Sequence, residues 1–163
     1  MLALLVVVAS ATQATTPSPI EGRYWTADRG GIIEMLTCDD RLEGRILWRA
    51  EPLLDAKNPD EKLRGRSMIG VTFLSGFRYD PSRDRWHDGT VYSADNGRTY
   101  RGRVWLEDEG RTMKMRGFVG VSLLGRTATF ARVAPGETVP ADLGRATGGG
   151  ESAGPVACSD RGS

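Results

Sequence analysis

The middle of the chain reads Trp86-His-Asp-Gly-Thr-Val-Tyr-Ser-Ala-Asp-Asn-Gly-Arg-Thr-Tyr-Arg-Gly-Arg-Val-Trp-Leu106, and this stretch decides the fold class. The dipeptide Asn96-Gly97 supplies the positive φ values that a tight hairpin turn requires. After the turn, Tyr100, Gly102 and Val104 alternate with arginine. Alternation with a period of two is typical of a strand that buries one face. The stretch therefore predicts two antiparallel strands, 86–93 and 98–106, joined by a hairpin.

The same alternation, interrupted by short turn sequences, runs from about residue 20 to residue 133. No stretch of ten or more residues has a clear period of 3.6, which would indicate a helix. The predicted strands cover residues 22–26, 32–38, 42–49, 69–77, 86–93, 98–106, 112–118 and 125–133, with a long loop at 50–66. Only Leu47 interrupts the pattern of its strand, in which Leu42, Gly44, Ile46 and Trp48 share one face.

Eight consecutive antiparallel strands leave two exposed edges unless the sheet closes on itself. Eight is also the number at which a closed barrel holds either one small ligand or only its own side chains. We therefore predict an all-β fold, an eight-stranded antiparallel up-and-down barrel over residues 20–133. A two-sheet sandwich is the alternative architecture.

The N-terminal residues 1–14 carry no charge and predict an export signal. An apolar run at 2–9 is followed by the small residues that signal peptidase requires, and we expect cleavage after Ala14. No basic residue precedes the run, and a buried N-terminal strand is the alternative. No cysteine stands directly beside the signal, so we expect a periplasmic or secreted protein without a lipid anchor.

Residues 134–163 are dominated by Gly, Ala, Pro, Ser and Thr. Such a segment buries too little apolar surface to offset its chain entropy, so we predict a disordered tail. The two cysteines are Cys38 and Cys158, which could pair in an oxidising compartment. The sequence leaves open whether they do.

The net charge is +1, which implies neither a nucleic acid nor an anionic membrane as partner. No continuous apolar run is long enough to span a membrane. The basic residues are nearly all arginine, with lysine only at 57, 62 and 114. Arginine suits bidentate recognition of carboxylate or phosphate, whereas the codon usage of a GC-rich genome explains the same bias. Both interpretations remain open.

The sequence offers little for catalysis, because His87 is the only histidine and no nucleophile, zinc or phosphate-loop motif is present. We expect no enzymatic activity and no cofactor. The segment 55–60 contains carboxylate and amide oxygens that could bind a hard cation. Its Asn58-Pro59-Asp60 sequence has strong turn chemistry, however, and favours a structural role.

Aromatic residues fall on most of the predicted strands, and in a closed barrel they could line a cavity. Alternation directs five side chains toward a common interior: Trp48, Phe73, Tyr92, Tyr100 and Met115. We predict that they bind a small hydrophobic or amphipathic molecule. The alternative is a barrel filled by its own side chains, which acts as an interaction module and has an envelope protein as partner.

The order of the motifs resembles the domain of unknown function family 2147 of exported bacterial proteins. The resemblance covers nearly the whole barrel and is carried by Gly22-Arg-Tyr-Trp-Thr-Ala-Asp28, Gly31-Ile-Ile-Glu-Met35 with Cys38, Leu42-Glu-Gly-Arg-Ile-Leu-Trp48, Asp55-Ala-Lys-Asn-Pro-Asp60, Trp86-His-Asp-Gly89, Val91-Tyr92, Asp95-Asn-Gly-Arg-Thr-Tyr100, Met115-Arg-Gly-Phe-Val-Gly120 and Gly125-Arg-Thr127 with Arg132. It implies a lipocalin-like or calycin-like barrel without an established enzymatic role. It also implies binding of a small apolar or amphipathic molecule.

The chain departs from the family pattern at Glu43, where the family often has a second cysteine, and at Phe130, where it tends to have tryptophan. In lipocalins an N-terminal Gly-x-Trp packs beneath an arginine of the last strand, and Gly22-Arg23-Tyr24 with Arg132 resembles this arrangement. We therefore expect it to close the barrel. The residues expected to be structural are Gly22, Tyr24, Asn58, Pro59, Asp60, Gly97 and Arg132.

Overall fold

The computed structural model describes residues 19–120 and 125–143, and the predicted export signal lies outside these residues. The strands are β1 Gly22–Thr26, β2 Gly31–Cys38, β3 Arg41–Arg49, β4 Thr72–Asp80, β5 Arg85–Ser93, β6 Arg98–Glu107, β7 Thr112–Phe118 and β8 Arg126–Arg132. Two short 3-10 helices, η1 Glu61–Leu63 and η2 Asp108–Gly110, lie in the loops. Within the described residues no helix is long and apolar enough to cross a membrane.

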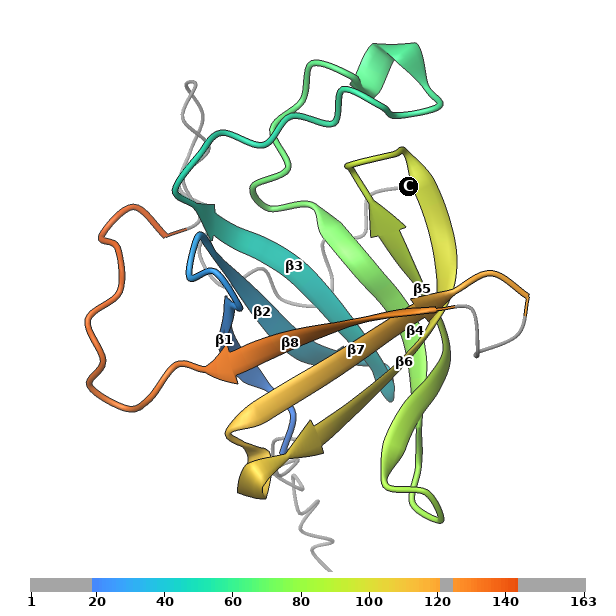
Figure 1. Cartoon of the computed structure of the whole chain (residues 1–163), viewed down its shortest axis with the longest axis vertical. Helices are drawn as coiled ribbons and strands as arrows, with labels where there is room; N and C mark the ends of the chain where they lie inside the picture. The colour runs from blue at the N-terminus through green and yellow to red at the C-terminus, as the bar shows by residue number, and fades with distance from the viewer. Residues whose placement is uncertain (1–18, 121–124, 144–163) are drawn as a thin grey trace, which may run out of the picture.

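The strands form one closed antiparallel barrel in chain order (Figure 1). Closure occurs between β1 and β8, where Tyr24 pairs with Arg132 and Thr26 pairs with Phe130. The predicted eight-stranded up-and-down barrel is confirmed, and the sandwich alternative is wrong. Closure leaves neither β1 nor β8 with an unpaired edge, which removes the aggregation hazard of an open sheet.

One predicted strand begins three residues too early. The prediction placed its start at Ile69, whereas β4 begins at Thr72. The residues before β4 follow a different path because Gly70 has a φ of +83°. The backbone there bonds to β3, with Gly70 N–H donating to the Ile46 carbonyl at 2.7 Å.

The barrel interior is filled at its middle by Phe77, which is fully buried. The ring lies against Gly89 of β5 and Gly102 of β6, where an added Cβ would come within 1.9 Å and 2.7 Å of it. These glycines therefore make room for the ring. Around it pack the other members of the main core: Ile20, Tyr24, Ile33, Met35, Leu42, Ile46, Met68, Leu74, Trp86, Val91, Val104, Met113 and Phe130.

A second apolar cluster lies apart from the main core. It consists of Trp25, Ile32 and Leu47, with the side chains of Trp48, Val133, Val139 and Leu143 packed against it. Figure 1 shows the segment that follows β8 running along the outside of the barrel. We call residues 133–143 the strap.

The strap is also held by hydrogen bonds, since Trp25 Nε1–H donates to Glu137 Oε1 at 3.1 Å and Ala134 N–H donates to Glu137 Oε2 at 2.9 Å. The sequence predicted that all of 134–163 is a disordered tail. The first ten of these residues instead pack on the barrel wall, because Val139 and Leu143 find an apolar surface there. Residues 144–163 lie outside the described residues.

Candidate functional site

The five residues predicted to line one interior cavity do not share one face of the sheet. Trp48 is the clearest correction, because it packs in the second cluster, with its ring 6.2 Å from that of Trp25 in an edge-to-face arrangement. The cause is a β-bulge in which Ile32 pairs with Trp48 while Ile33 pairs with Ile46. The extra residue is Leu47, and it reverses the facing of everything that follows it on β3.

Tyr92 and Tyr100 lie on opposite faces of the β5–β6 ladder. Tyr100 pairs with the buried Val91, and Tyr92 pairs with Thr99. Directly paired residues share a face and neighbours along a strand alternate, so Tyr100 shares the inner face with Val91. Tyr92 also packs against the main core, and its hydroxyl donates to the buried Asp55. Met115 joins Tyr100 on the inner face, since it pairs with the fully buried Val104.

Phe73 is the extra residue of a second bulge, because its neighbours Thr72 and Leu74 pair with Arg45 and Gly44. It is half-buried and packs against the main core, as do Tyr92 and Met115. The predicted pocket is thus divided: Phe73, Tyr92 and Met115 pack against the main core, Tyr100 shares the inner face of β6 without joining that cluster, and Trp48 packs in the second cluster.

One end of the barrel is covered by the loop between β3 and β4, residues 50–71 (Figure 1). Asp55 is its most buried polar residue, with no exposed surface. Its carboxylate accepts hydrogen bonds from Asn58 Nδ2 at 2.7 Å, from Arg66 Nε at 3.0 Å and from the hydroxyl of Tyr92. Burial alone would raise the pKa of Asp55, but these donors outweigh it and hold the pKa below its ordinary value.

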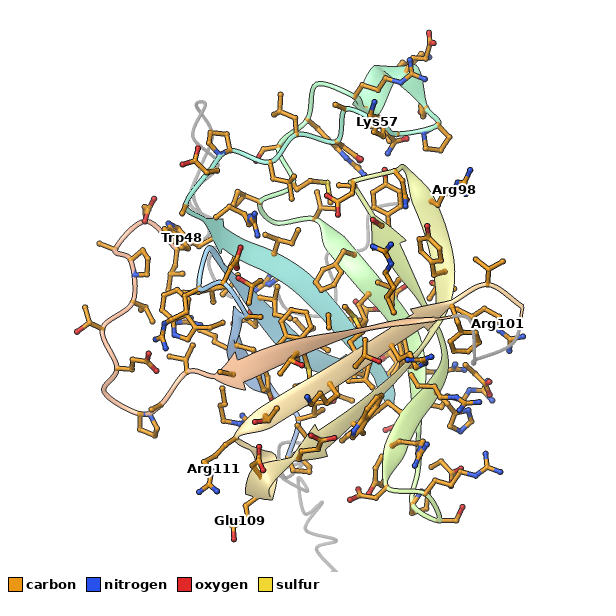
Figure 2. All side chains as sticks on the ribbon, in the orientation of Figure 1. Trp48, Lys57, Arg98, Arg101, Glu109 and Arg111 are labelled. Atoms are coloured by element: carbon orange, nitrogen blue, oxygen red, sulfur yellow. The ribbon has the colours of Figure 1, made fainter. Side chains whose placement is uncertain are left out.

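The turn that follows Asp55 is built from its own side chains. Asn58 Oδ1 accepts from Asp60 N–H at 2.8 Å, and Asp60 Oδ1 accepts from Lys62 N–H at 3.0 Å, which caps η1. Pro59 lies between them and is exposed. Gly97 is required beside this turn, because its φ is +67° and an added Cβ would lie 1.8 Å from the Lys57 carbonyl oxygen. Figure 2 shows Lys57 on this covering loop.

The opposite end of the barrel is closed around Tyr24 and Arg132. The guanidinium lies 4.7 Å from the centre of the Tyr24 ring and donates to the carbonyls of Gly110 at 2.7 Å and Glu21 at 2.8 Å, as well as to the Tyr24 hydroxyl. Burial raises the pKa of Tyr24 to about 12, although the Arg132 cation acts in the other direction. Gly22 is needed here, because an added Cβ would lie 2.7 Å from Arg132 Nη1.

A hollow of about 700 Å³ lies at this same end. We call it the Trp86 hollow, and its lining residues are Pro19, Thr37, Asp39, Asp40, Arg41, Leu42, Arg78, Tyr79 and Trp86. Trp86 and Tyr79 form an aromatic wall with ring centres 4.8 Å apart. Trp86 is nearly buried, whereas Tyr79 is 47% exposed. The rim of the Trp86 hollow carries carboxylate and guanidinium groups. The hollow therefore combines an apolar wall with a polar edge.

A second hollow of about 420 Å³ adjoins the first, since Pro19 and Trp86 line both. Sequence reasoning missed this end because it assigned Phe73 of β4 and Tyr92 of β5 to a central cavity and gave Tyr79 and Trp86 no place in the site. A usable signal was present, since Tyr79 and Trp86 flank the Asp80-Pro81 turn and paired positions beside a turn come together.

Within residues 19–120 and 125–143, no three His, Cys, Asp or Glu side chains lie close enough together to hold a metal ion. The carboxylate of Asp55 is instead occupied by side-chain donors. Cys38 is buried and disulfide-bonded, and Cys158 lies outside the described residues.

Comparisons with known proteins agree with this geometry. A profile described as an uncharacterised protein family conserved in bacteria, DUF2147, matches residues 22–132. Among solved structures, HP1028 from Helicobacter pylori, described as belonging to the lipocalin family, superposes with a TM-score of 0.62 at 24% identity, covering 71% of this chain and 83% of that one. No curated protein matches the chain.

Proposed function

The chain belongs to the DUF2147 family and has a lipocalin-like barrel. From this premise, we propose that it binds a small amphipathic molecule in the Trp86 hollow. The observation that carries this proposal is the aromatic wall of Tyr79 and Trp86 beneath a charged rim. Ligand sites in proteins typically measure about 300–1,000 Å³ and combine apolar walls with a few polar groups. The hollow has this size and composition.

The chemistry of the ligand follows from the two parts of the hollow. An apolar body packs on Tyr79 and on the edge of Trp86, and each 100 Å² of apolar surface removed from water contributes about 2.5 kcal/mol. A polar head lies at the rim, near Arg41 and Arg78. Because association itself is costly, this supports micromolar binding of a small molecule and requires no catalytic group.

The test is a titration with N-phenyl-1-naphthylamine, a neutral apolar probe whose fluorescence rises in a dry site. We expect saturable binding that Tyr79→Ala weakens at least tenfold. The exposure of Tyr79 means that the fold tolerates this change. Leu54→Ala is the matched control, because Leu54 is 51% exposed on the covering loop at the other end of the barrel.

Two results would contradict the proposal. One is probe binding that Tyr79→Ala leaves unchanged, and the other is the absence of saturable binding by the probe and by a panel of fatty acids and lysophospholipids. Backbone amide shifts measured during the titration give an independent location. Under the proposal they cluster at 37–42 and 78–86.

One observation favours a second candidate, an interaction module with a filled barrel. Phe77 occupies the middle of the interior so closely that Gly89 and Gly102 cannot carry a side chain. A barrel filled in this way presents only its outer surface and its ends to a partner. This candidate predicts that no probe binds at either end.

We further propose that the chain is exported, as the uncharged apolar N-terminus indicates. Expression of the full gene followed by fractionation and N-terminal sequencing tests this. Mature protein that begins at Thr15 in the periplasm or medium is the expected result. Cytoplasmic protein that retains Met1 would contradict export.

A further inference from the structure

A groove on the outer wall of the barrel, formed by β5, β6 and the end of β7, gathers arginine side chains. Its volume is about 580 Å³, and we call it the arginine groove. The lining residues are Arg83, Arg85, His87, Asp88, Arg101, Gly102, Arg103, Phe118 and Gly120. It shares no lining residue with the Trp86 hollow. Figure 2 shows Arg101 projecting outward from the wall.

The groove holds more positive charge than the protein neutralises. Asp88 is the only carboxylate in its lining and lies 3.7 Å from Arg101, with both side chains more than half exposed. Asp80, just outside the lining, lies 3.7 Å from the mostly exposed Arg83. Exposed ion pairs of this kind contribute little. Among the described residues, neither Arg85 nor Arg103 has a carboxylate within 4 Å. Arg103 also pairs directly with Arg116 across the β6–β7 ladder, and like charges in that position are destabilising.

The other side of the barrel shows that the arginine content alone does not impose this arrangement. On β2 and β3, Arg45 pairs across the ladder with Glu34 and forms an ion pair with it. The same glutamate lies 3.5 Å from Arg23. A bias in codon usage raises the number of arginines everywhere. It does not explain why Arg23 and Arg45 lie beside a glutamate while Arg85 and Arg103 of the groove have no carboxylate partner among the described residues.

Local structure gives the groove a defined shape. A bulge on β5 at His87 and Asp88, where Asp88 has a φ of +62°, bends the strand along one side. His87 Nδ1 and Asp88 Oδ2 lie 2.8 Å apart. On the other side, the Arg103 guanidinium lies 5.6 Å from the centre of the nearly buried Phe118 ring, and this contact restricts its orientation.

We propose that the arginine groove binds a ligand carrying a diphosphate, or two neighbouring phosphate groups. Four guanidinium groups with the carboxylates of Asp88 and Asp80 beside them leave a charge of about +2, which a diphosphate matches and a single carboxylate does not. The groove exceeds the volume of a diphosphate, so an organic body fits beside Phe118. The phosphates belong either to a free small molecule or to a lipid headgroup.

The experiment is a calorimetric titration of the full chain with inorganic pyrophosphate at 50 mM salt, with succinate as the dicarboxylate comparison. We expect one site, with succinate binding at least tenfold more weakly. Arg101→Gln and Arg103→Gln should each weaken pyrophosphate binding at least fivefold. Arg98→Gln is the matched control, because Arg98 is an exposed residue of β6 outside the groove (Figure 2).

Thermal unfolding separates binding from folding. Because Arg103 opposes Arg116, Arg103→Gln should leave the melting temperature unchanged or raise it while it weakens binding. Tyr79→Ala should leave pyrophosphate binding intact, so failure of the Trp86 hollow as a site does not imply failure here.

Vesicle sedimentation distinguishes the two sources of phosphate. Vesicles of phosphatidylcholine with 5% phosphatidylinositol 4,5-bisphosphate, whose headgroup carries two neighbouring phosphates, serve as the headgroup probe, and pure phosphatidylcholine serves as the control. Binding to pyrophosphate without vesicle binding supports a free ligand, and vesicle binding that requires Arg101 and Arg103 supports a headgroup. Absence of both, equal binding of succinate, or equal losses in Arg98→Gln would overturn the proposal.

Discussion

The two ends of the barrel are closed in different ways. At one end the loop 50–71 turns inward, and its buried carboxylate, Asp55, is fully surrounded by donors. At the other end Arg132 closes the barrel from the last strand, and two adjoining hollows remain beside Trp86. Between them Phe77 fills the interior.

This difference locates the proposed ligand site. Opening the covered end would break the hydrogen bond that Tyr92 of β5 donates to Asp55 and would expose Met68, which packs in the main core, so it is costly. The end beside Trp86 offers its aromatic wall without any rearrangement. We therefore place the proposed ligand site of this lipocalin-like barrel at one end, because Phe77 fills the middle of its axis.

We expect the largest loss of stability from Phe77→Ala, the substitution that would connect the two ends of the barrel. Phe77→Ala removes the ring that separates them and leaves a cavity against Gly89 and Gly102, so the free energy of unfolding should fall by about 3–5 kcal/mol. Chemical denaturation measures this. Phe77→Leu keeps most of the volume and should cost less than half as much. A loss below about 1 kcal/mol for Phe77→Ala would mean that the interior is not packed as described.

Removing the carboxylate at the covered end should have the next largest effect. Asp55→Ala leaves Asn58, Tyr92 and Arg66 without their shared acceptor, and we expect a loss of about 2–3 kcal/mol. The value is below that of a fully buried ion pair because the Arg66 side chain is 37% exposed. Asp60→Ala, which removes only an exposed cap, is the control and should cost about 1 kcal/mol or less. Equal losses in the two variants would contradict a special role for Asp55.

The contribution of Asp55 should also depend on pH. Its pKa is lower in the folded protein than in the unfolded chain, so its stabilising effect is complete above the unfolded pKa of about 3.9. The effect is lost as the pH falls through the folded pKa. The difference in unfolding free energy between the native chain and Asp55→Asn should therefore be constant from pH 6 to 8 and shrink below pH 4. A difference that grows on acidification would reverse the assigned direction.

The fold could be predicted from the sequence because each strand shows its own local pattern of alternating residues. Alternation and the Asn96-Gly97 turn are local signals, and closure follows from the number of strands. The candidate site depended instead on which way particular side chains face. The bulge at Leu47 turned Trp48 out of the core, and the bulge at Phe73 shifted the alternation of β4.

Such bulges are set by the tertiary fit between neighbouring strands, so alternation within one strand does not reveal them. Leu47 was the one departure from the pattern of its strand, and it marked the place where the register changes. The strap was missed for a similar reason. Val139 and Leu143 are too few to indicate burial by themselves, and they pack only because Trp25, Ile32 and Leu47 form an apolar surface on the barrel wall.

The smallest expected effect on stability lies at the end beside Trp86. Arg132→Ala removes hydrogen bonds to the carbonyls of Gly110 and Glu21 and the contact with the buried Tyr24 ring. Gly110 and Glu21 are partly exposed, so water can replace the lost hydrogen bonds. We therefore expect a loss of about 1–2 kcal/mol, less than for Asp55→Ala. Arg132 also lines the smaller hollow, so the same variant should alter probe binding at this end, whereas Asp55→Ala should not. Paired denaturation and probe titrations of the two variants measure both effects. A larger stability loss for Arg132→Ala, without any change in probe binding, would show that this end is the more tightly closed one and would move the ligand site elsewhere.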